Sequence, residues 1–445
     1  MIYVLYAIAA FVVLAMCVLA VKDFGRFLFL GAFIFNFHAV GVDMGVYLTL
    51  DKVFAWIGAF VLLMTGLTLP RRSWFLAFAW MMGYMTLLTV FMQATGALSS
   101  QMTYVHSMGW GTGQSFLRLP VQLVSQITVW IILVIGYSMG RQAQVVNGFI
   151  WGAVCNALIG FYQVLAAVRG LPWLPADVLS KLSGENAGQF QVQNSNIFRL
   201  SGLAGEPKHA AASFVFAIVL LMCLQVNGTK WKTIVLGIAL VATFSTSGWF
   251  AFAVIYGVFM FYRRKFVQLS LAAAFVLLIV LATQVNTSVA FIVETRIVTR
   301  FADPTSYEYK DAALLDVAKN EPAILFTGAG AGGIDLFLMR WIKTNKLEKG
   351  GALSPTYLLT ELLGDYGVIG LTIFAFLLLG MARSFRGDLR VFYIASLLAM
   401  FMLPRFTVLP PVLLVLGSTM RAIDDSREES QREIAAPGLE VGIVA

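Results

Sequence analysis

The segment Asn196-Ile-Phe-Arg-Leu-Ser-Gly-Leu-Ala-Gly-Glu-Pro-Lys-His209 lies where a polar part of the chain enters an apolar span that begins near Ala210. It combines an arginine, a carboxylate, a lysine and a histidine, which are Arg199, Glu206, Lys208 and His209. Ionisable groups beside a membrane span are costly unless they are paired or functional, so this cluster predicts a functional site. The structural alternative is a solvated loop whose charges contact lipid headgroups.

The same segment contains the residues that a tight loop and a helix start require. Two glycines, Gly202 and Gly205, allow the backbone to bend closely. Pro207 fixes φ for a first helical turn and lacks an N–H that would have no partner there. We therefore expect a loop that leads directly into a membrane helix.

The composition is that of a polytopic membrane protein. Hydrophobic residues make up 59% of the 445 residues and charged residues only 12%, whereas a soluble domain carries about a quarter charged residues. We predict an all-α fold, with residues 1–445 forming a single membrane domain of about 12 transmembrane helices. Three cysteines lie in apolar runs and are expected to be core residues without disulfides: Cys17, Cys155 and Cys223.

The distribution of the net charge of +8 predicts the topology. Basic and acidic residues balance in the tracts 170–208 and 285–355. The basic excess lies in short connections, at Lys22, Arg26, Arg71, Arg72, Arg141, Lys230, Lys232, Arg263, Arg264, Lys265, Arg383, Arg386 and Arg390. Because basic short loops face the cytoplasm, both tracts are predicted to be long extracytoplasmic loops containing short helices. This placement of charge excludes nucleic-acid binding.

The apolar runs give the expected spans. They are 2–21, 27–42, 53–69, 74–92, 120–139, 145–168, 209–226, 233–246, 248–262, 266–284, 356–382 and 391–417. The connection Val40–Lys52 is expected to be an outer loop. Residues 418–445 form a polar tail, and the prolines between 404 and 411 leave open which side of the membrane it faces.

The second long tract contains a helix signal and a glycine-rich run. Thr305 and Glu308 form a capping box, which predicts a helix over 306–320. A strand-like apolar run over 323–326 then leads into Gly328-Ala-Gly-Ala-Gly-Gly333. This run matches a dinucleotide fingerprint, but no βαβ unit surrounds it. We expect a loop whose N–H groups form an anion-binding nest, or alternatively a glycine-rich turn.

The ionisable residues suit transfer of a group from a lipid diphosphate. No metal-binding or cofactor motif occurs, so no metal and no cofactor are expected. Arginine binds phosphate oxygens with two parallel hydrogen bonds, and a carboxylate at a helix start can act as a general base. The cations would hold the diphosphate while the carboxylate accepts a proton from an attacking hydroxyl.

These residues also carry a family resemblance. Phe198-Arg-Leu-Ser-Gly-Leu-Ala-Gly-Glu-Pro207 and Thr246-Ser-Gly248 resemble segments of the O-antigen ligase and Wzy-type polysaccharide polymerase superfamily. Further similar motifs follow in order and cover the chain to about residue 380: Arg296, Lys310-Asp-Ala-Ala-Leu314, Glu321-Pro322, Gly328-x-Gly330, Ser354-Pro-Thr-Tyr-Leu358, Glu361 and Gly364-Asp-Tyr-Gly-Val-Ile-Gly370.

The resemblance implies a glycosyltransferase in the bacterial inner membrane. It would polymerise polyprenyl-diphosphate-linked oligosaccharide repeat units at the periplasmic face, with a flippase and a chain-length regulator as possible partners. The implied catalytic residues are Glu206, Arg199 and His209. The residues implied to bind diphosphate or sugar are Arg296, Arg300, Lys310, Lys208, Gly328, Gly330 and Glu361.

Two alternatives remain. A ligase would transfer the glycan to lipid A core or to a protein, but ligases carry a histidine–asparagine pair where this chain has Ser354-Pro355. Lys310 also stands where relatives more often have arginine. A transporter or flippase would place charges within spans and contain two related halves, whereas the charges here concentrate in the two long tracts.

The topology predicts that both long tracts can be labelled from outside. Cysteines introduced as Gln189→Cys and Lys346→Cys are expected to react with an impermeant thiol reagent in cells whose outer membrane alone is permeabilised. Labelling that requires lysis of the inner membrane would contradict the topology and the location of the site.

Overall fold

We describe the protein from a computed structural model. The structure describes residues 2–37, 40–43, 47–65, 73–97, 141–172, 190–191, 198–224, 229–267, 317–341, 358–383 and 387–400, and the single positions 123, 124, 127, 270, 314 and 403. Over these residues the fold is mostly helical, with twelve helices and four short strands. The two short sheets are antiparallel pairs of strands.

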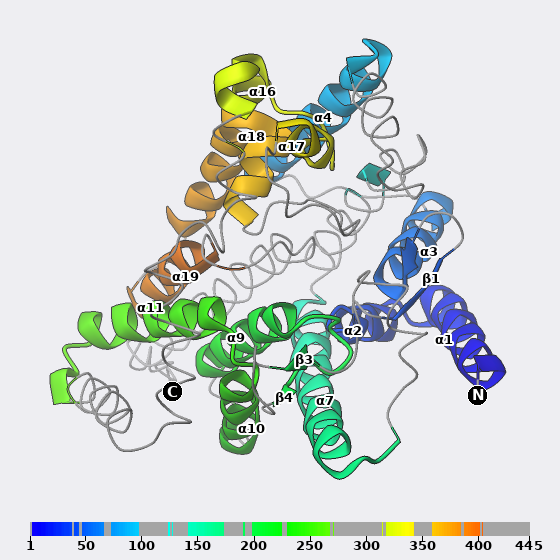
Figure 1. The fold of residues 1–445 in the computed structure, drawn as a ribbon, viewed down its shortest axis with the longest axis vertical. Helices are drawn as coiled ribbons and strands as arrows, with labels where there is room; N and C mark the ends of the chain where they lie inside the picture. The colour runs from blue at the N-terminus through cyan, green and yellow to red at the C-terminus, as the bar shows by residue number, and fades with distance from the viewer. Residues whose placement is uncertain are drawn as a thin grey trace, which may run out of the picture.

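The N-terminal helices lie at one side of the molecule, on the right in Figure 1. Helix α1 (Ile2–Lys22) contacts α2 (Phe24–Ile34) and α3 (Leu50–Thr65). Between α2 and α3 lies a hairpin of β1 (Gly41–Asp43) and β2 (Tyr47–Thr49). The hairpin occupies the connection that the sequence predicted as a loop.

Helix α9 (Pro207–Leu224) forms the centre of the fold. Every residue from Ala210 to Leu221 is buried, as expected for a helix that is apolar on all sides. It is contacted by α7 (Gln142–Arg169), α10 (Thr229–Ala242) and α11 (Thr246–Tyr262). The segment that the sequence singled out therefore opens the most deeply buried helix of the described chain.

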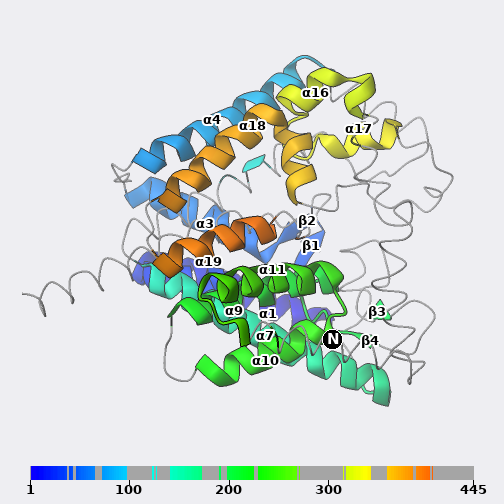
Figure 2. The ribbon, with the colours of Figure 1, turned by 90° about the vertical axis from the view of Figure 1, so that its left-hand side faces the viewer.

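A second group of helices lies at one end of the molecule (Figures 1 and 2). It consists of α4 (Ser73–Ala94), α16 (Pro322–Thr327), α17 (Ile334–Trp341) and α18 (Leu358–Arg383). Helix α19 (Gly387–Met400) contacts both α18 and α11, so it connects this group to the helices around α9.

Two described helices are long and apolar enough to cross a membrane, at Ala143–Arg169 and Leu359–Gly380. Shorter apolar helices cover Ala10–Lys22, Phe24–Ile34, Pro207–Met222 and Thr246–Tyr262. The predicted helical fold is confirmed, whereas the count of about 12 spans stays a prediction. The predicted runs 120–139 and 266–284 and the tail 418–445 lie almost entirely outside the described residues.

Two predicted elements differ in the structure. The run 323–326 is helical, within α16, and not a strand. Four apolar residues fit either structure, but Pro322 at the first helical position favours the helix. The helix predicted over 306–320 ends where expected, because residues 317–320 are helical and Glu321 is not. The predicted start of that helix lies outside the described residues.

Helix α2 ends earlier than the predicted run 27–42. The Asn36 side-chain amide donates to the carbonyl oxygen of Phe33, at 3.4 Å, and to that of Phe149 on α7, at 3.1 Å. A short polar side chain that bonds nearby carbonyls competes with continuation of the helix. Asn36 therefore both ends α2 and attaches it to α7.

Glycines allow α2 and α7 to approach closely. A Cβ at Gly148 would lie 2.2 Å from the carbonyl oxygen of Phe29, and one at Gly152 would lie 2.3 Å from that of Phe33. These neighbours are backbone atoms that cannot move without shifting the helix. Small residues four apart on an apolar helix are a common way for membrane helices to pack.

Gly152→Ala is expected to destabilise the protein, because the added methyl group overpacks the α2–α7 contact at a cost of about 1–3 kcal/mol. Gly257→Ala on α11 is the matched control, since a Cβ there would meet no described atom within 4 Å. That control is expected to be neutral or slightly stabilising. Thermal unfolding of the purified variants measures both effects, and equal stability of the two variants would contradict the packing argument.

Candidate functional site

The loop that leads into α9 begins with a two-residue strand. Strand β4 (Phe198–Arg199) pairs antiparallel with β3 (Phe190–Gln191). The N–H of Leu200 then donates to the carbonyl oxygen of Ala242, the last residue of α10, at 2.9 Å. We call residues 198–206 the site loop.

Two amide side chains of α7 hold the site loop. Gln163 Oε1 accepts hydrogen bonds from the backbone N–H groups of Ser201, at 3.1 Å, and Gly202, at 2.9 Å. Asn156 Oδ1 accepts from the N–H of Leu203 at 2.7 Å. Both amides are buried. An apolar helix thus supplies the acceptors that an irregular buried backbone needs.

The glycines of the site loop are required by its geometry. Gly202 has a φ of 58° and Gly205 a φ of 85°, in the left-handed region that favours glycine. A Cβ at Gly202 would also lie 2.4 Å from Asn156 Oδ1. At Gly160 on α7, a Cβ would overlap the buried side chain of Leu200. The loop consequently sits directly against α7.

Arg199 bonds the end of α10. Its Nε donates to the carbonyl oxygen of Thr243, at 3.1 Å, and one Nη donates to that of Phe244, at 3.4 Å. Carbonyl groups at a helix C-terminus have no partner within the helix, and the negative end of the helix dipole favours a cation there. In this structure the guanidinium therefore stabilises the turn between α10 and α11.

That turn is strained and capped. Phe244 has a φ of 47°, which is unusual for a residue other than glycine. Ser245 caps α11 by accepting from the N–H of Gly248, at 3.4 Å. A Cβ at Gly248 would lie 2.5 Å from that of Ala211 on α9. The predicted Thr246-Ser-Gly248 motif thus lies against the start of α9, beside the site loop.

Glu206 and Lys208 form an ion pair at the start of α9. Lys208 Nζ lies 2.7 Å from Glu206 Oε2, and both side chains are about one-third exposed, at 36% and 35%. The carbonyl oxygen of Glu206 accepts from the N–H groups of His209 and Ala210. An ion pair with this exposure contributes little to stability. The same exposure leaves the Glu206 carboxylate accessible to solvent at the start of α9.

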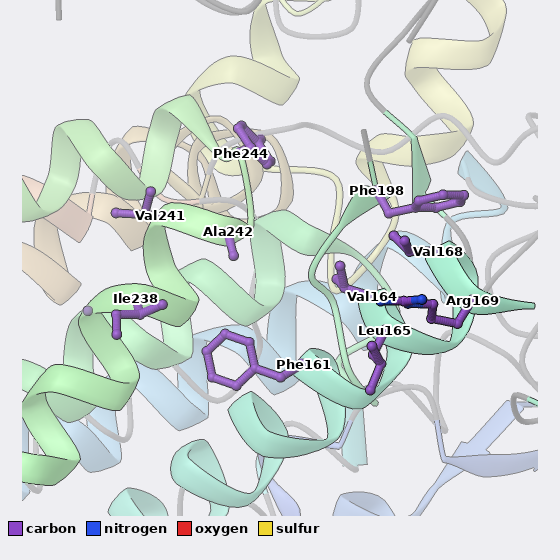
Figure 3. A pocket seen from close by; sticks show the side chains of 11 residues that line it. Phe161, Val164, Leu165, Val168, Arg169, Phe198, Ile238, Val241, Ala242 and Phe244 are labelled. Atoms are coloured by element: carbon purple, nitrogen blue, oxygen red, sulfur yellow. The ribbon is translucent and has the colours of Figure 1, made fainter. Parts of the chain in front are cut away.

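An apolar groove of about 920 Å³ opens beside the site loop, between α7 and α10. Figure 3 shows Phe198, Val168 and Arg169 on one side, Ile238 and Val241 on the other, and the ring of Phe161 between them. The full lining is Phe161, Val164, Leu165, Val168, Arg169, Phe198, Gly237, Ile238, Val241, Ala242 and Phe244. Arg169 contributes its positive charge at the end of α7.

The glycine-rich run lies in a different part of the molecule, against α18. Each backbone N–H from Gly328 to Ile334 donates within the chain: to the carbonyl oxygens of Ile324, Gly364, Asp365 and Gly330, to Thr89 Oγ1, and to the Asp365 carboxylate. In this structure the run is therefore a closed turn and does not present its N–H groups to an anion. This conformation matches the second alternative given in the sequence analysis, a glycine-rich turn.

Asp365 on α18 connects the glycine-rich turn to α17. Its two carboxylate oxygens accept from the N–H groups of Gly332, at 2.9 Å, and Ile334, at 3.2 Å, so it caps α17. Gly367 has a φ of 65° and kinks α18, and a Cβ there would lie 2.3 Å from the carbonyl oxygen of Phe326. Glu361 is buried one turn before Asp365.

The structure thus unites some predicted site residues and separates others. Arg199, Glu206, Lys208 and His209 lie together, whereas Gly328, Gly330 and Glu361 lie with α16–α18, apart from the site loop in both views (Figures 1 and 2). Three further predicted residues lie outside the described part of the chain: Arg296, Arg300 and Lys310. Within the described residues no three His, Cys, Asp or Glu side chains are grouped to hold a metal ion.

Sequence reasoning missed Asn156 and Gln163, although a signal existed. Both are amides inside an apolar run, seven residues apart, and so lie on one face of the helix. Polar residues within an apolar helix normally have a partner in the protein interior. Their partner, the site loop, could not be identified from spacing alone.

The comparisons with known proteins do not assign the chain. No protein-family model matches it, and no curated protein matches it. The family resemblance of the motifs therefore stays a prediction, and the geometry of the site loop and groove is the basis for a functional proposal.

Gln163→Met is expected to lower the free energy of unfolding by about 2 kcal/mol, because two buried N–H groups of the site loop lose their acceptor. Gln144→Met is the matched control on the same helix, since the buried Oε1 of Gln144 has no hydrogen-bond partner among the described residues. Chemical unfolding of both variants measures the difference. A loss of stability in Gln144→Met as large as that in Gln163→Met would contradict the role of Gln163.

Proposed function

We propose that the protein is a membrane glycosyltransferase that polymerises oligosaccharide repeat units carried on polyprenyl diphosphate. The observation that carries the proposal is the contact between the site loop and an apolar groove between α7 and α10: Phe198 lines this groove, and the next residue, Arg199, donates to the carbonyl oxygen of Phe244, which also lines it. A lipid-linked glycan has an apolar chain, an anionic diphosphate and a polar sugar. In the proposal the groove receives the apolar chain, the cationic side chains bind the diphosphate, and the solvent-accessible start of α9 receives the sugar.

The groove suits the apolar chain of such a donor. Its lining is almost entirely hydrophobic, and exposed residues of α7 and α10, such as Leu165 and Ile238, continue it onto the surface of the helices. An open apolar surface between membrane helices can receive a lipid chain from the bilayer. Arg169 at the end of the groove would then lie near the anionic group.

The chemistry follows from the residues around the start of α9. The hydroxyl of the acceptor sugar attacks the anomeric carbon of the growing chain, and the bond from that carbon to the diphosphate oxygen breaks. Glu206 accepts the hydroxyl proton as general base. Cationic side chains stabilise the leaving diphosphate, and Arg199 contributes by fixing the loop and by its charge. His209 is the neighbouring group that could exchange the proton with Glu206.

The topology proposed for this activity places the site loop at the periplasmic face of the inner membrane. Helices α7 and α10 run in the same direction, because their C-terminal halves line the groove while Trp151, in the N-terminal half of α7, meets Trp231, in the first turn of α10. The basic residues Arg141 and Lys230 thus lie at the opposite end from the site loop. That is the arrangement that cytoplasmic basic connections would produce.

Glu206→Gln is expected to reduce polymerisation by ~10²–10⁴-fold, because it removes the proton acceptor while preserving volume and hydrogen bonding. The reaction is measured with the purified protein in lipid vesicles and a synthetic lipid-linked repeat unit, by following chain length and released polyprenyl diphosphate. Thermal unfolding of the same samples separates a catalytic effect from loss of the ion pair with Lys208.

Glu321→Gln is the matched control, because Glu321 also precedes a proline at the start of a helix, α16. It is expected to retain parental turnover. Near-parental turnover of Glu206→Gln would exclude Glu206 as the base and leave His209 to be tested. Movement of the donor across the membrane without chain growth would support a transporter instead of a polymerase.

A further inference from the structure

Lys232 and two tryptophans gather where the first turn of α10 meets the N-terminal half of α7, away from the site loop. Lys232 Nζ lies 4.1 Å from the centroid of the Trp151 ring and 5.8 Å from that of Trp231. The two indole rings are 5.9 Å apart, with an interplanar angle of 57°. We call Trp151, Trp231 and Lys232 the lysine–indole cluster.

The depth of this cluster follows from the lengths of the two helices. Helix α10 has 14 residues and is therefore about 21 Å long, whereas the hydrocarbon core is about 30 Å thick. Its other end is fixed to the site loop through the bond from Leu200 N to Ala242 O. With the site loop at the periplasmic face, as proposed above, the basic end of α10 falls short of the opposite edge of the hydrocarbon core.

The contact with α7 agrees with this position. Lys232 does not meet α7 at its basic start, beside Arg141, but at Trp151, which lies about 13 Å further along the helix at 1.5 Å per residue. The lysine ammonium is thus held inside the length of a helix that can cross a membrane. A charge at such a depth is costly unless a counter-ion accompanies it.

The described part of the chain provides no carboxylate in an ion pair with Lys232. The two indole rings attract the ammonium through their π faces, but they leave its charge uncompensated. The surface of α10 next to it is apolar, with Trp231 and Ile234 exposed. The missing partner would therefore have to combine an anion with apolar chains.

We propose that the lysine–indole cluster binds the headgroup of an anionic phospholipid of the cytoplasmic leaflet. The lipid phosphate would contact Lys232, and its acyl chains would lie against the exposed side chain of Ile234 on α10. A lipid with net negative charge is favoured over a zwitterionic one, because the choline of the latter is repelled by Lys232. The site lies outside the groove and does not depend on the glycosyltransferase activity, although its assignment to the cytoplasmic leaflet rests on the proposed topology.

The test compares the thermal midpoint of the full-length protein in nanodiscs of phosphatidylcholine with that in phosphatidylcholine mixed with phosphatidylglycerol. The parent is expected to unfold at a higher temperature in the mixture. Lys232→Gln is expected to lose most of this increase, whereas Lys232→Arg, which keeps the charge and the contact with the rings, is expected to retain it. Lys265→Gln, at an exposed lysine beyond α11, is the matched control and is expected to behave like the parent.

Native mass spectrometry provides the second measurement. Phosphatidylglycerol is expected to remain bound to the parent and to Lys232→Arg but not to Lys232→Gln. A Trp151→Leu variant, which keeps Lys232, is expected to bind phosphatidylglycerol more weakly than the parent. It provides a second test if Lys232→Gln does not fold. Retention of the lipid preference in Lys232→Gln and Trp151→Leu would overturn the proposal. An equal loss in Lys265→Gln, or stabilisation of the parent in phosphatidylcholine by inorganic phosphate alone, would overturn it as well.

Discussion

The hydrogen bonds from the site loop to Gln163 are the interaction on which the rest of this site depends. An irregular backbone that lies among apolar helices cannot use water, so each of its N–H groups needs an acceptor from the protein. Helix α7 supplies acceptors from side chains, which leaves its own backbone bonds intact. The loop can then turn at Gly202, enter α9 at Pro207 and hold Glu206 at the helix start.

The same solution occurs at the glycine-rich turn, whose N–H groups find acceptors in Asp365 of α18 and Thr89 of α4. In both places a polar side chain of a long apolar helix, Gln163 or Asp365, accepts hydrogen bonds from two backbone N–H groups of a neighbouring loop. In both places, too, the bonds require an approach that only glycine permits, at Gly202 and at Gly367. At these two places the glycines are explained by close contacts within the protein.

The positions of the helices could be predicted from the sequence more accurately than the contacts between residues. The apolar runs located α1, α4, α7 and α9 to within a few residues, because burial or lipid contact on all sides leaves a continuous signal. It was wrong about 323–326, where four apolar residues carry no periodicity. The cluster at the start of α9 was visible as charges beside a span. The partners of that cluster were not, because Gln163 precedes it by some 40 residues and the carbonyl of Thr243 follows it by as many, and neither separation leaves a trace in local spacing.

Gly237 shows how the groove between α7 and α10 constrains the sequence. A glycine inside a helix costs about 0.5–1 kcal/mol relative to alanine, and at Gly148 and Gly152 close packing of helices explains it. Close packing does not explain Gly237, since a Cβ there would meet no described atom within 4 Å. Gly237 lines the groove, so any side chain would project into its open space and narrow it. A glycine at this position, despite its cost to the stability of α10, is explained if the groove must stay wide. A groove that receives a lipid chain has that requirement.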